Sequence, residues 1–340
     1  MKSIVGFLLI DAPFSALNNA GMDTGSKTDN TVVVKVIKKG KENYPYVSAQ
    51  AWRYWWRDTL KEKYNWEMSP IEREKKIAFT AANPFKYIDD DLFGYMRAQK
   101  EKDGGTLTRI SPLKNSPLVS IYNQNPTIDF GVMGRHEGDP VPFEHQFYSV
   151  VLKGIFSIDL ANTGVFGLTS RTGYKNLDEK YVEKSEIQES IKNSNSILSK
   201  ETNQYILSKA HRVKRVENLL TSLSYMSGGA KQALHHTDVT PKFIVLMVIE
   251  GGNNILMNIV NENIANDYAE KVININALKS VLVDYEDIIK SDIYIGRNEG
   301  FQDNLKEDLK ALCDFNSKIK VETVRNTLET FSKIIKDHII

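Results

Sequence analysis

Three of the four tryptophans of this chain lie in one short segment, residues 48–64, and this segment constrains the fold more than any other. An α-helix has about 3.6 residues per turn, so the large apolar side chains of the segment fall on one helix face. Ser48 is a suitable N-cap immediately before them. We therefore predict a helix that is buried by its tryptophan face. That face consists of Ala51, Trp52, Trp55, Trp56 and Thr59.

Arg53 and Arg57 lie one turn apart on the neighbouring flank of this predicted helix. Two guanidinium groups at a fixed spacing suit a repeating phosphate backbone, because each can form paired hydrogen bonds with phosphate oxygens. The alternative is a core helix whose arginines pair with local acids such as Asp58 and Glu62. The helix alone leaves both interpretations open.

Four β-rich runs and two helical segments set the order of the remaining elements. Apart from insertions, the order is strand, helix, strands, helix, strand, which is typical of the split βαβ pattern of ferredoxin-like domains. We therefore predict an α+β protein with a ferredoxin-like (RRM-like) core, a topology that can bind single-stranded RNA on its sheet. The strands are expected at residues 3–10, 31–37, 150–160 and 243–249, and the helices at 48–64 and 204–225.

The other segments are expected to be additions to a discontinuous core of residues 1–65 and 146–250. Residues 66–119 are predicted to form a helical insertion, with its helix at 70–100. Residues 120–149 are rich in Gly, Pro and Asn, and predict a protruding β-hairpin, a thumb, with strands at 127–133 and 141–148. Residues 176–201 are polar and are expected to be mobile. Residues 251–340 are expected to be a mainly helical C-terminal region, with helices at 305–312 and 321–339.

The charge balance excludes a strong overall attraction to nucleic acid. The 340 residues include 44 Lys and Arg against 43 Asp and Glu, for a net charge of +1. Residues 1–250 carry a net charge of +5 and the remainder carries −4. A local basic surface in the first part is therefore possible but is not required.

Cysteine content and hydropathy indicate a cytoplasmic protein. Cys313 is the only cysteine, which excludes an intramolecular disulfide and a cysteine-based zinc cluster. The N-terminus resembles a short secretory signal, but Asp11 interrupts the apolar run, so we predict a first strand there. The longest apolar run, residues 243–249, is too short to cross a bilayer, and no membrane partner is expected.

Two polar segments have the composition of phosphate-binding loops. In residues 227–232, Gly228 and Gly229 would let backbone amides approach a phosphate, and Lys231 adds charge, although a helix C-cap explains the glycines equally well. The spacing does not match the loop that binds nucleotide triphosphates. Residues 15–21 after the first strand offer further amides, and Lys27 follows them.

The sequence contains few groups arranged for catalysis. None of the six histidines has the spacing of a metal site, so neither a metal nor another cofactor is expected. Asp89, Asp90 and Asp91 could bind a cation, but an acidic start to a helix needs no function. The chemistry that the residues suggest is binding, and we predict that the chain is not an enzyme.

In this order, the motifs resemble the DevR family, the type I-B branch of the repeated backbone subunit in CRISPR Cascade complexes. The resemblance covers about residues 1–250. It rests on the first strand with the loop at 15–21, on VSAQAWRYWWRDTL, on DDDLFGYM and RISPLKNSPL, and on GGAKQ. It implies a subunit stacked in several copies along a guide RNA, which pairs with target DNA, beside other Cascade subunits. No cofactor is implied.

The resemblance also implies which residues contact RNA. The loop after the first strand, the tryptophan helix and the glycine-rich loop would grip the RNA backbone, while Met133 and Phe143 of the thumb wedge against bases. Arg135 and His145 would meet phosphate or the next subunit. The predicted RNA-binding residues are Asn18, Asn19, Lys27, Arg53, Arg57, Arg109, Met133, Arg135, Phe143, His145, Ser227, Gly228, Gly229, Lys231 and Gln232.

Two other functions remain open at this stage. Related backbone subunits of type III complexes cleave target RNA with an aspartate in the loop after the first strand, and Asp23 or Asp29 could serve here. Nothing near either aspartate supplies a second metal ligand at a recognisable spacing. The other alternative is a structural or regulatory protein that binds no RNA.

Overall fold

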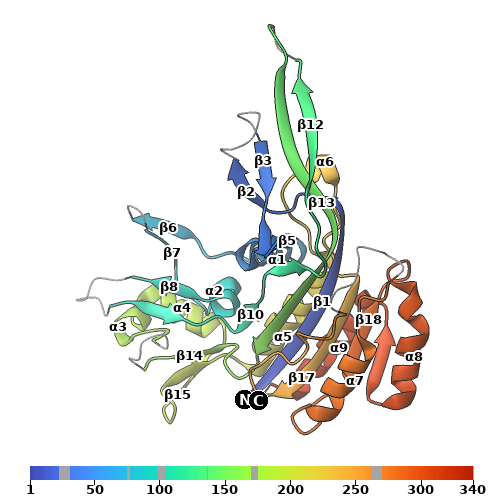
Figure 1. Cartoon of the computed structure of the whole chain (residues 1–340). Helices are drawn as coiled ribbons and strands as arrows, with labels where there is room; N and C mark the ends of the chain where they lie inside the picture. Colours follow the sequence, from blue (N-terminus) through green and yellow to red (C-terminus); the bar gives the residue numbers. More distant parts are fainter. Residues whose placement is uncertain are drawn as a thin grey trace.

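A mixed α+β architecture surrounds one large sheet in the computed structural model, which describes residues 1–22, 31–74, 77–98, 105–135, 137–169, 175–261 and 270–339 (Figure 1). The centre of the sheet consists of four antiparallel neighbours in the order β17, β1, β13 and β11. These strands span Phe243–Glu250, Lys2–Ser15, Val141–Asp159 and Leu118–Ser120.

The tryptophan helix is confirmed as α1 (Ala49–Tyr64), and the Ser48 hydroxyl caps it by accepting a hydrogen bond from the Ala51 amide. The rings of Trp52 and Trp56 stack with centroids 5.3 Å apart, and both side chains are fully buried. The Trp56 ring also meets Phe156 of β13 edge-on. Burial of these rings therefore fixes α1 against the central sheet.

The second core helix is α5 (Lys209–Thr221), continued by a 3₁₀ turn over Ser222–Tyr225. The predicted start at residue 204 was wrong, because Ser208 caps the helix and Ile206 belongs to strand β16 (Gln204–Ile206). The Trp56 indole donates to the Leu219 carbonyl at 2.9 Å. Thus α1 and α5 pack together on one face of the sheet.

The predicted second strand, residues 31–37, belongs to the large sheet, but along β13 it pairs only with the thumb part and not with the central part. It divides into β3 (Thr31–Val34) and β4 (Val36–Lys39), separated at Lys35, and β4 forms an outer edge beside β5 (Glu42–Val47). The place beside β13 is taken by β11 and by β10 (Leu113–Asn115). Each is only three residues long, too short to show the alternation by which strands are recognised.

The predicted thumb hairpin is confirmed. Strand β12 (Thr127–Met133) pairs with the first part of β13, from Thr127 opposite Phe147 to Met133 opposite Val141. Figure 1 shows this hairpin projecting from the body. The pieces predicted at 141–148 and 150–160 are one continuous strand, so the hairpin is a rigid extension of the central sheet.

The insertion is largely β-structure, and the helix predicted at residues 70–100 was wrong. Its elements are β6 (Ile71–Glu74), β7 (Ile77–Thr80), α2 (Ile88–Phe93), β8 (Tyr95–Arg97) and β9 (Leu107–Arg109). Helix α2 ends at Gly94, which has φ +75° and where a Cβ would lie 2.5 Å from the Arg109 carbonyl oxygen. Tertiary contacts therefore override local helix propensity here.

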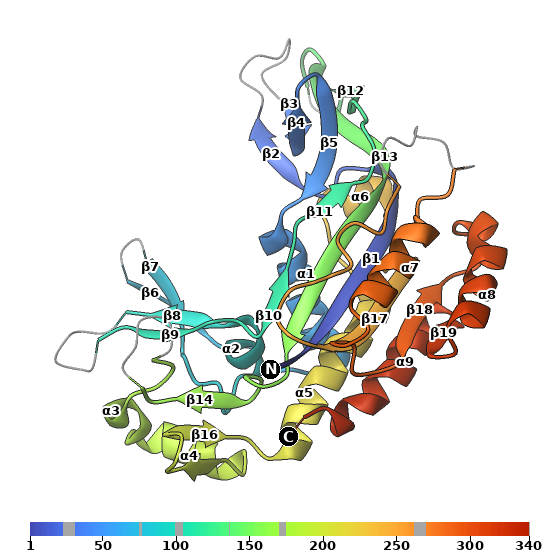
Figure 2. The same ribbon diagram turned by 60° about the horizontal axis from the view of Figure 1, so that its bottom comes forward.

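Residues 176–201 were expected to be mobile. They instead pack against the insertion and complete its apolar core. They contribute α3 (Glu179–Val182), α4 (Ser185–Asn193) and β15 (Ile197–Ser199), which pairs with β16, and β16 in turn pairs with β14 (Val165–Gly167). Figure 2 shows these elements beside β6 to β9, away from the central sheet. Tyr181 and Ile187 are buried with Phe166 in a second apolar cluster.

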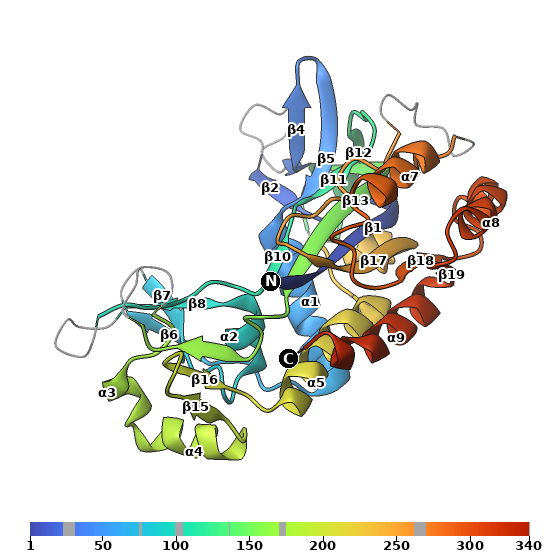
Figure 3. The same ribbon diagram turned by 90° about the horizontal axis from the view of Figure 1, so that it is seen from below.

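The C-terminal region is joined to the central sheet through two strands that the sequence did not predict. Strand β18 (Ile293–Arg297) pairs antiparallel with β17, and β19 (Ile319–Glu322) pairs parallel with β18. The predicted helices are found as α8 (Lys306–Phe315) and α9 (Val324–Ile334), together with α7 (Ile275–Asp284). Figure 3 shows α9 beside α5. No helix among the described residues is long and apolar enough to span a membrane.

Candidate nucleic-acid interface

The glycine-rich loop is held by close contacts with the two other predicted RNA-binding segments. Gly228 has φ +144° and Gly229 has φ +101°. A Cβ on Gly228 would lie 2.5 Å from Cγ of Trp55, and one on Gly229 would lie 2.6 Å from a methyl group of Leu17. The Ala230 amide donates to the Leu17 carbonyl at 2.9 Å. Both glycines are therefore required by packing within the protein.

Two groups of this loop that were predicted to bind phosphate form hydrogen bonds within the protein instead. The Ser227 amide, expected to face phosphate, donates to the Thr59 hydroxyl at 3.2 Å. The Gln232 side-chain amide donates to the carbonyls of Gly228 and Thr237. Gln232 thus fixes the loop and the short helix α6 (Gln232–His235), whereas Lys231, at φ +58°, is half-buried at the start of that helix.

The loop after β1 lies beside the glycine-rich loop. The Asn18 side-chain oxygen accepts from the Ser48 amide at 2.9 Å, so it orients the start of α1. The Asn19 side-chain oxygen is buried with no partner among the described residues. Lys27, and the aspartates Asp23 and Asp29 considered for cleavage, lie outside the described residues.

Arg53 does not face outward as predicted. Its guanidinium donates to the carbonyls of Leu113 and Phe93 and to the side chains of Asn115 and Ser111, at 2.7–3.0 Å. Burial, followed by repulsion from Arg57, lowers the pKa of Arg53 to about 10. These partners come from segments far away in the sequence. Arg53 therefore links α1 to the insertion, and we remove it from the RNA-binding set.

Substitution of the two helix arginines separates these roles. We expect Arg53→Ala to lower the free energy of unfolding by about 2–3 kcal/mol, because it removes four hydrogen bonds that a partly buried guanidinium donates to residues of the insertion. Arg57→Ala should cost at most about 1 kcal/mol, since Arg57 stacks over Phe93 with its guanidinium carbon 5.4 Å from the ring centroid. Urea denaturation measures both values, and equal losses would contradict this assignment.

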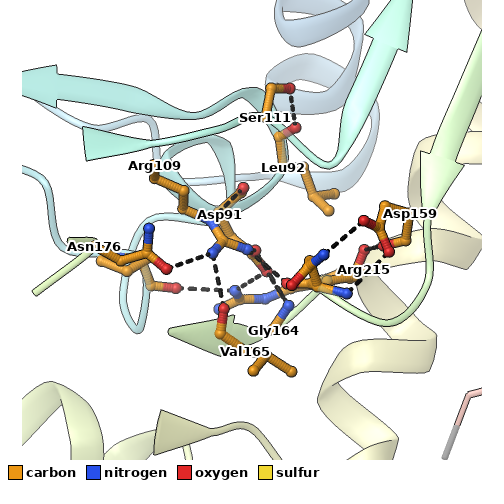
Figure 4. A network of polar contacts seen from close by, with 12 residues as sticks. Asp91, Leu92, Arg109, Ser111, Asp159, Gly164, Val165, Asn176 and Arg215 are labelled. Carbon is orange, nitrogen blue, oxygen red and sulfur yellow. Dashed lines mark hydrogen bonds and ion pairs between the residues drawn. The ribbon is translucent and has the colours of Figure 1, made fainter. Parts of the chain in front are cut away.

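Arg109 is likewise buried and bonded within the protein. Its side chain is 4% exposed and forms an ion pair with Asp91. It also donates to the carbonyls of Val165 and Asn162 at 2.8 Å (Figure 4). Arg215 of α5 binds the other Asp91 oxygen at 2.6 Å. Nothing in the sequence indicates this role of Arg215 beyond its position on a core helix.

The acidic start of α2 serves the fold. The Asp90 carboxylate accepts from the Ser69 hydroxyl at 2.8 Å and from the Asn83 amide at 2.9 Å. Burial is the main reason why the pKa of Asp90 rises to about 6. Among the described residues, no group of three His, Cys, Asp or Glu side chains could hold a metal ion.

Asp90 should make stability depend on pH. Its pKa in the folded state, about 6, exceeds the value of about 3.9 for an unfolded chain, so its contribution to stability decreases as pH rises from about 4 to about 6. Asp90→Asn removes this loss. We expect the variant to gain up to about 2 kcal/mol relative to wild type between pH 4.5 and pH 7.5, in urea denaturation. Glu201→Gln, at an exposed site, should leave the profile unchanged; a parallel profile for Asp90→Asn would contradict the assignment.

The thumb presents different side chains on its two faces. Met133 and Arg135 are exposed near the tip, whereas Phe143 is half-buried and stacks on His145, which is 7% exposed. On the opposite face, alternate residues of β12 form an exposed apolar stripe that sequence analysis did not single out, although its period of two was visible. The stripe consists of Ile128, Phe130 and Val132, each more than half exposed.

A basic cavity of about 510 Å³ lies beside this stripe, between the base of the thumb and strands β2 (Asn19–Met22) to β5. Its lining includes Lys35 and Lys38 with Tyr46 and Gln146. By contrast, the face of the sheet opposite α1 and α5 is covered. There, Asn254 donates to the carbonyls of Gly6 and Phe156 at 2.9 Å, and Lys153 donates to the Met257 carbonyl. The accessible interface is thus the thumb with the loops at its base.

Comparisons with known proteins agree with this geometry. A family model described as "CRISPR-associated negative auto-regulator DevR/Csa2" matches residues 12–273. No curated protein gives a match. A chain of the solved "CRISPR RNA-guided surveillance complex, pre-nicking" is 10% identical, with 97% of this chain and 99% of that chain covered and a TM-score of 0.53. A chain of a "CRISPR RNA-guided surveillance complex" is 9% identical over 98% and 99%, with a TM-score of 0.49.

At such low identity, the structure with a TM-score of 0.53 supports a shared fold only. The other structure, with a TM-score of 0.49, is too dissimilar to support an argument. The family match covers most of the chain, including α1, the thumb, the glycine-rich loop and β17. It ends before α7, so the last three helices lie beyond it. The chain belongs to the DevR/Csa2 family of CRISPR-associated proteins.

Proposed function

We propose that this chain is a non-catalytic, repeated backbone subunit of a CRISPR Cascade surveillance complex of the type I-B branch. It binds the phosphate backbone of a guide RNA and presents the guide for pairing with target DNA, next to further copies of itself and other Cascade subunits in the cytoplasm. The family match over residues 12–273 carries this proposal. The similar fold of a chain from an RNA-guided surveillance complex supports it.

The domain organisation that we propose follows the family. Residues 1–65 and 146–250 form a ferredoxin-like core, supported by the strand order β17, β1, β13, β11 and by α1 and α5 packed on one face. Residues 66–119 are an insertion of mainly β-structure, 120–149 are the thumb, and 251–340 extend the sheet and cover its edge.

The proposed RNA-binding surface runs from the loop after β1 across the glycine-rich loop to the thumb. Lys231 and Arg57 supply charge, and the exposed thumb side chains supply contacts with bases. Such phosphate contacts fix position without reading sequence. The set that remains after removal of the internally bonded residues is Asn19, Lys27 (outside the described residues), Arg57, Met133, Arg135, Phe143, His145, Gly228, Gly229 and Lys231.

Purification of the chain with its genomic neighbours in low salt, followed by sequencing of any bound nucleic acid, tests this function. We expect short RNAs of uniform length with repeat-derived ends. A complex without RNA would contradict the proposal. It would favour the regulatory alternative, which the family description also names. Cleavage of target RNA by the complex would instead indicate the type III-like alternative.

A further inference from the structure

Two histidines from different segments meet where the thumb joins the glycine-rich loop. His145 lies on β13 within the thumb, and His235 is the last residue of α6, just after the loop. Their ring centroids are 5.8 Å apart, with the rings inclined at 62°. Phe147 also contacts His235, at 6.0 Å. This contact therefore joins two parts of the proposed RNA-binding surface.

Each histidine has a buried nitrogen without a hydrogen-bond partner among the described residues. These atoms are Nδ1 of His145 and Nε2 of His235. The other nitrogen of His145, Nε2, lies 3.4 Å from the Asp129 carboxylate of β12. A buried polar atom without a partner costs free energy, and each such atom in a native protein needs an explanation. The pair thus offers two ring nitrogens that no described residue engages.

Burial and the surrounding charges disfavour the protonated form of His235 in the free chain. Burial is the main cause that lowers the pKa of His235, and repulsion from His145 and Lys231 adds to it, whereas the Asp129 carboxylate opposes these effects. Among the described elements packed around His235, the charged groups are those of His145, Lys231 and Asp129. Phe147, which contacts His235, and Phe14, which contacts Phe147, are uncharged. A phosphate placed near Lys231 would reverse this balance, because an opposite charge favours the protonated imidazole.

We propose that His145 and His235 form a proton-linked contact with a nucleic-acid phosphate at the base of the thumb. This inference deepens the proposed function, since it assigns the group that couples RNA binding to proton uptake. The contact requires α6 and β13 to adjust, because both unpartnered nitrogens are covered. The affinity for RNA then rises as pH falls through the pKa of His235 in the complex, and it levels off below the pKa of His235 in the free chain.

Fluorescence anisotropy of the full chain with labelled polyuridine RNA, at constant ionic strength, tests the proposal. Uridine carries no group that titrates near neutrality. We expect binding about tenfold tighter at about pH 6 than at about pH 8, as the uptake of a single proton allows. His235→Gln and His145→Gln should each flatten this dependence. His211→Gln, an exposed histidine on α5, should retain it.

A flat profile for the wild type, or a full profile in either glutamine variant, would overturn the inference while leaving RNA binding intact. Loss of all RNA binding by the wild type would instead contradict the proposed function. Histidine ring-proton NMR of the wild type gives a second measurement that needs no variant. Addition of RNA should move two histidine titrations upward, and unchanged titrations would refute the contact.

Discussion

Asp91→Ala is expected to lower the free energy of unfolding by about 3–5 kcal/mol, the largest effect of any single substitution outside the apolar core. The Asp91 carboxylate is fully buried and pairs with both Arg109 and Arg215. It also accepts from the Gly164 amide at 3.1 Å. Its removal leaves two buried guanidinium groups without their counter-charge.

Urea denaturation of Asp91→Ala and Asp91→Asn measures this effect. The asparagine variant keeps the shape and one acceptor but loses the charge, so it should be nearly as unstable as the alanine variant. Glu329→Ala provides a control, because it breaks an exposed ion pair with Arg325 and should cost less than about 1 kcal/mol. A loss below about 1 kcal/mol in Asp91→Ala would show that the arginines find other partners.

The position of Asp91 explains why so much depends on it. Arg109 comes from β9 of the insertion and Arg215 from α5 of the core, so one carboxylate joins the two parts of the molecule (Figure 4). Burial lowers the pKa of Arg215, and attraction to Asp91 opposes that effect. The expected outcome of its loss is a loosened insertion together with a less stable core.

The sequence predicted those elements whose signals are local. The periodicity of α1 and the turn composition between β12 and β13 each lie within one continuous segment, and both elements appeared with nearly the predicted bounds. Strands β10 and β11 were missed because each gains its identity from pairing with β13, far along the chain. The insertion strands were missed for the same reason.

Some candidate site residues were mispredicted for the same reason, because their partners are set by the fold and not by the local sequence. Arg53 and Gln232 are long polar side chains near loops, a pattern that predicts contact with a ligand. Their partners include backbone carbonyls, which no residue type reveals: Arg53 reaches Phe93 and Leu113, and Gln232 reaches Gly228 and Thr237. Only the folded chain shows that these donors are already used. Conversely, His235 has no sequence signal, because its meeting with His145 depends on the thumb.

Gly228→Ala is the second substitution with a large expected effect, and it acts on function more than on folding. Alanine at φ +144° costs about 1–3 kcal/mol in backbone strain, and its Cβ would lie 2.5 Å from the Trp55 ring. Trp55 is 5% exposed and cannot withdraw, so the loop must move. Displacement of Lys231 and α6 should weaken RNA binding at least about tenfold, which corresponds to about 1.4 kcal/mol.

Gly300→Ala is the control, because it introduces backbone strain without a collision. Gly300 also has a positive φ, +83°, but a Cβ there would meet no atom within 4 Å, and the residue lies in the C-terminal region. Both variants should lose some stability in thermal unfolding, whereas only Gly228→Ala should lose affinity for RNA. Equal affinities would mean that the loop tolerates the collision without moving. Equal affinities together with a larger loss of stability in Gly228→Ala would instead place the RNA grip outside this loop, because the collision with Trp55 would then have displaced the loop without cost to binding.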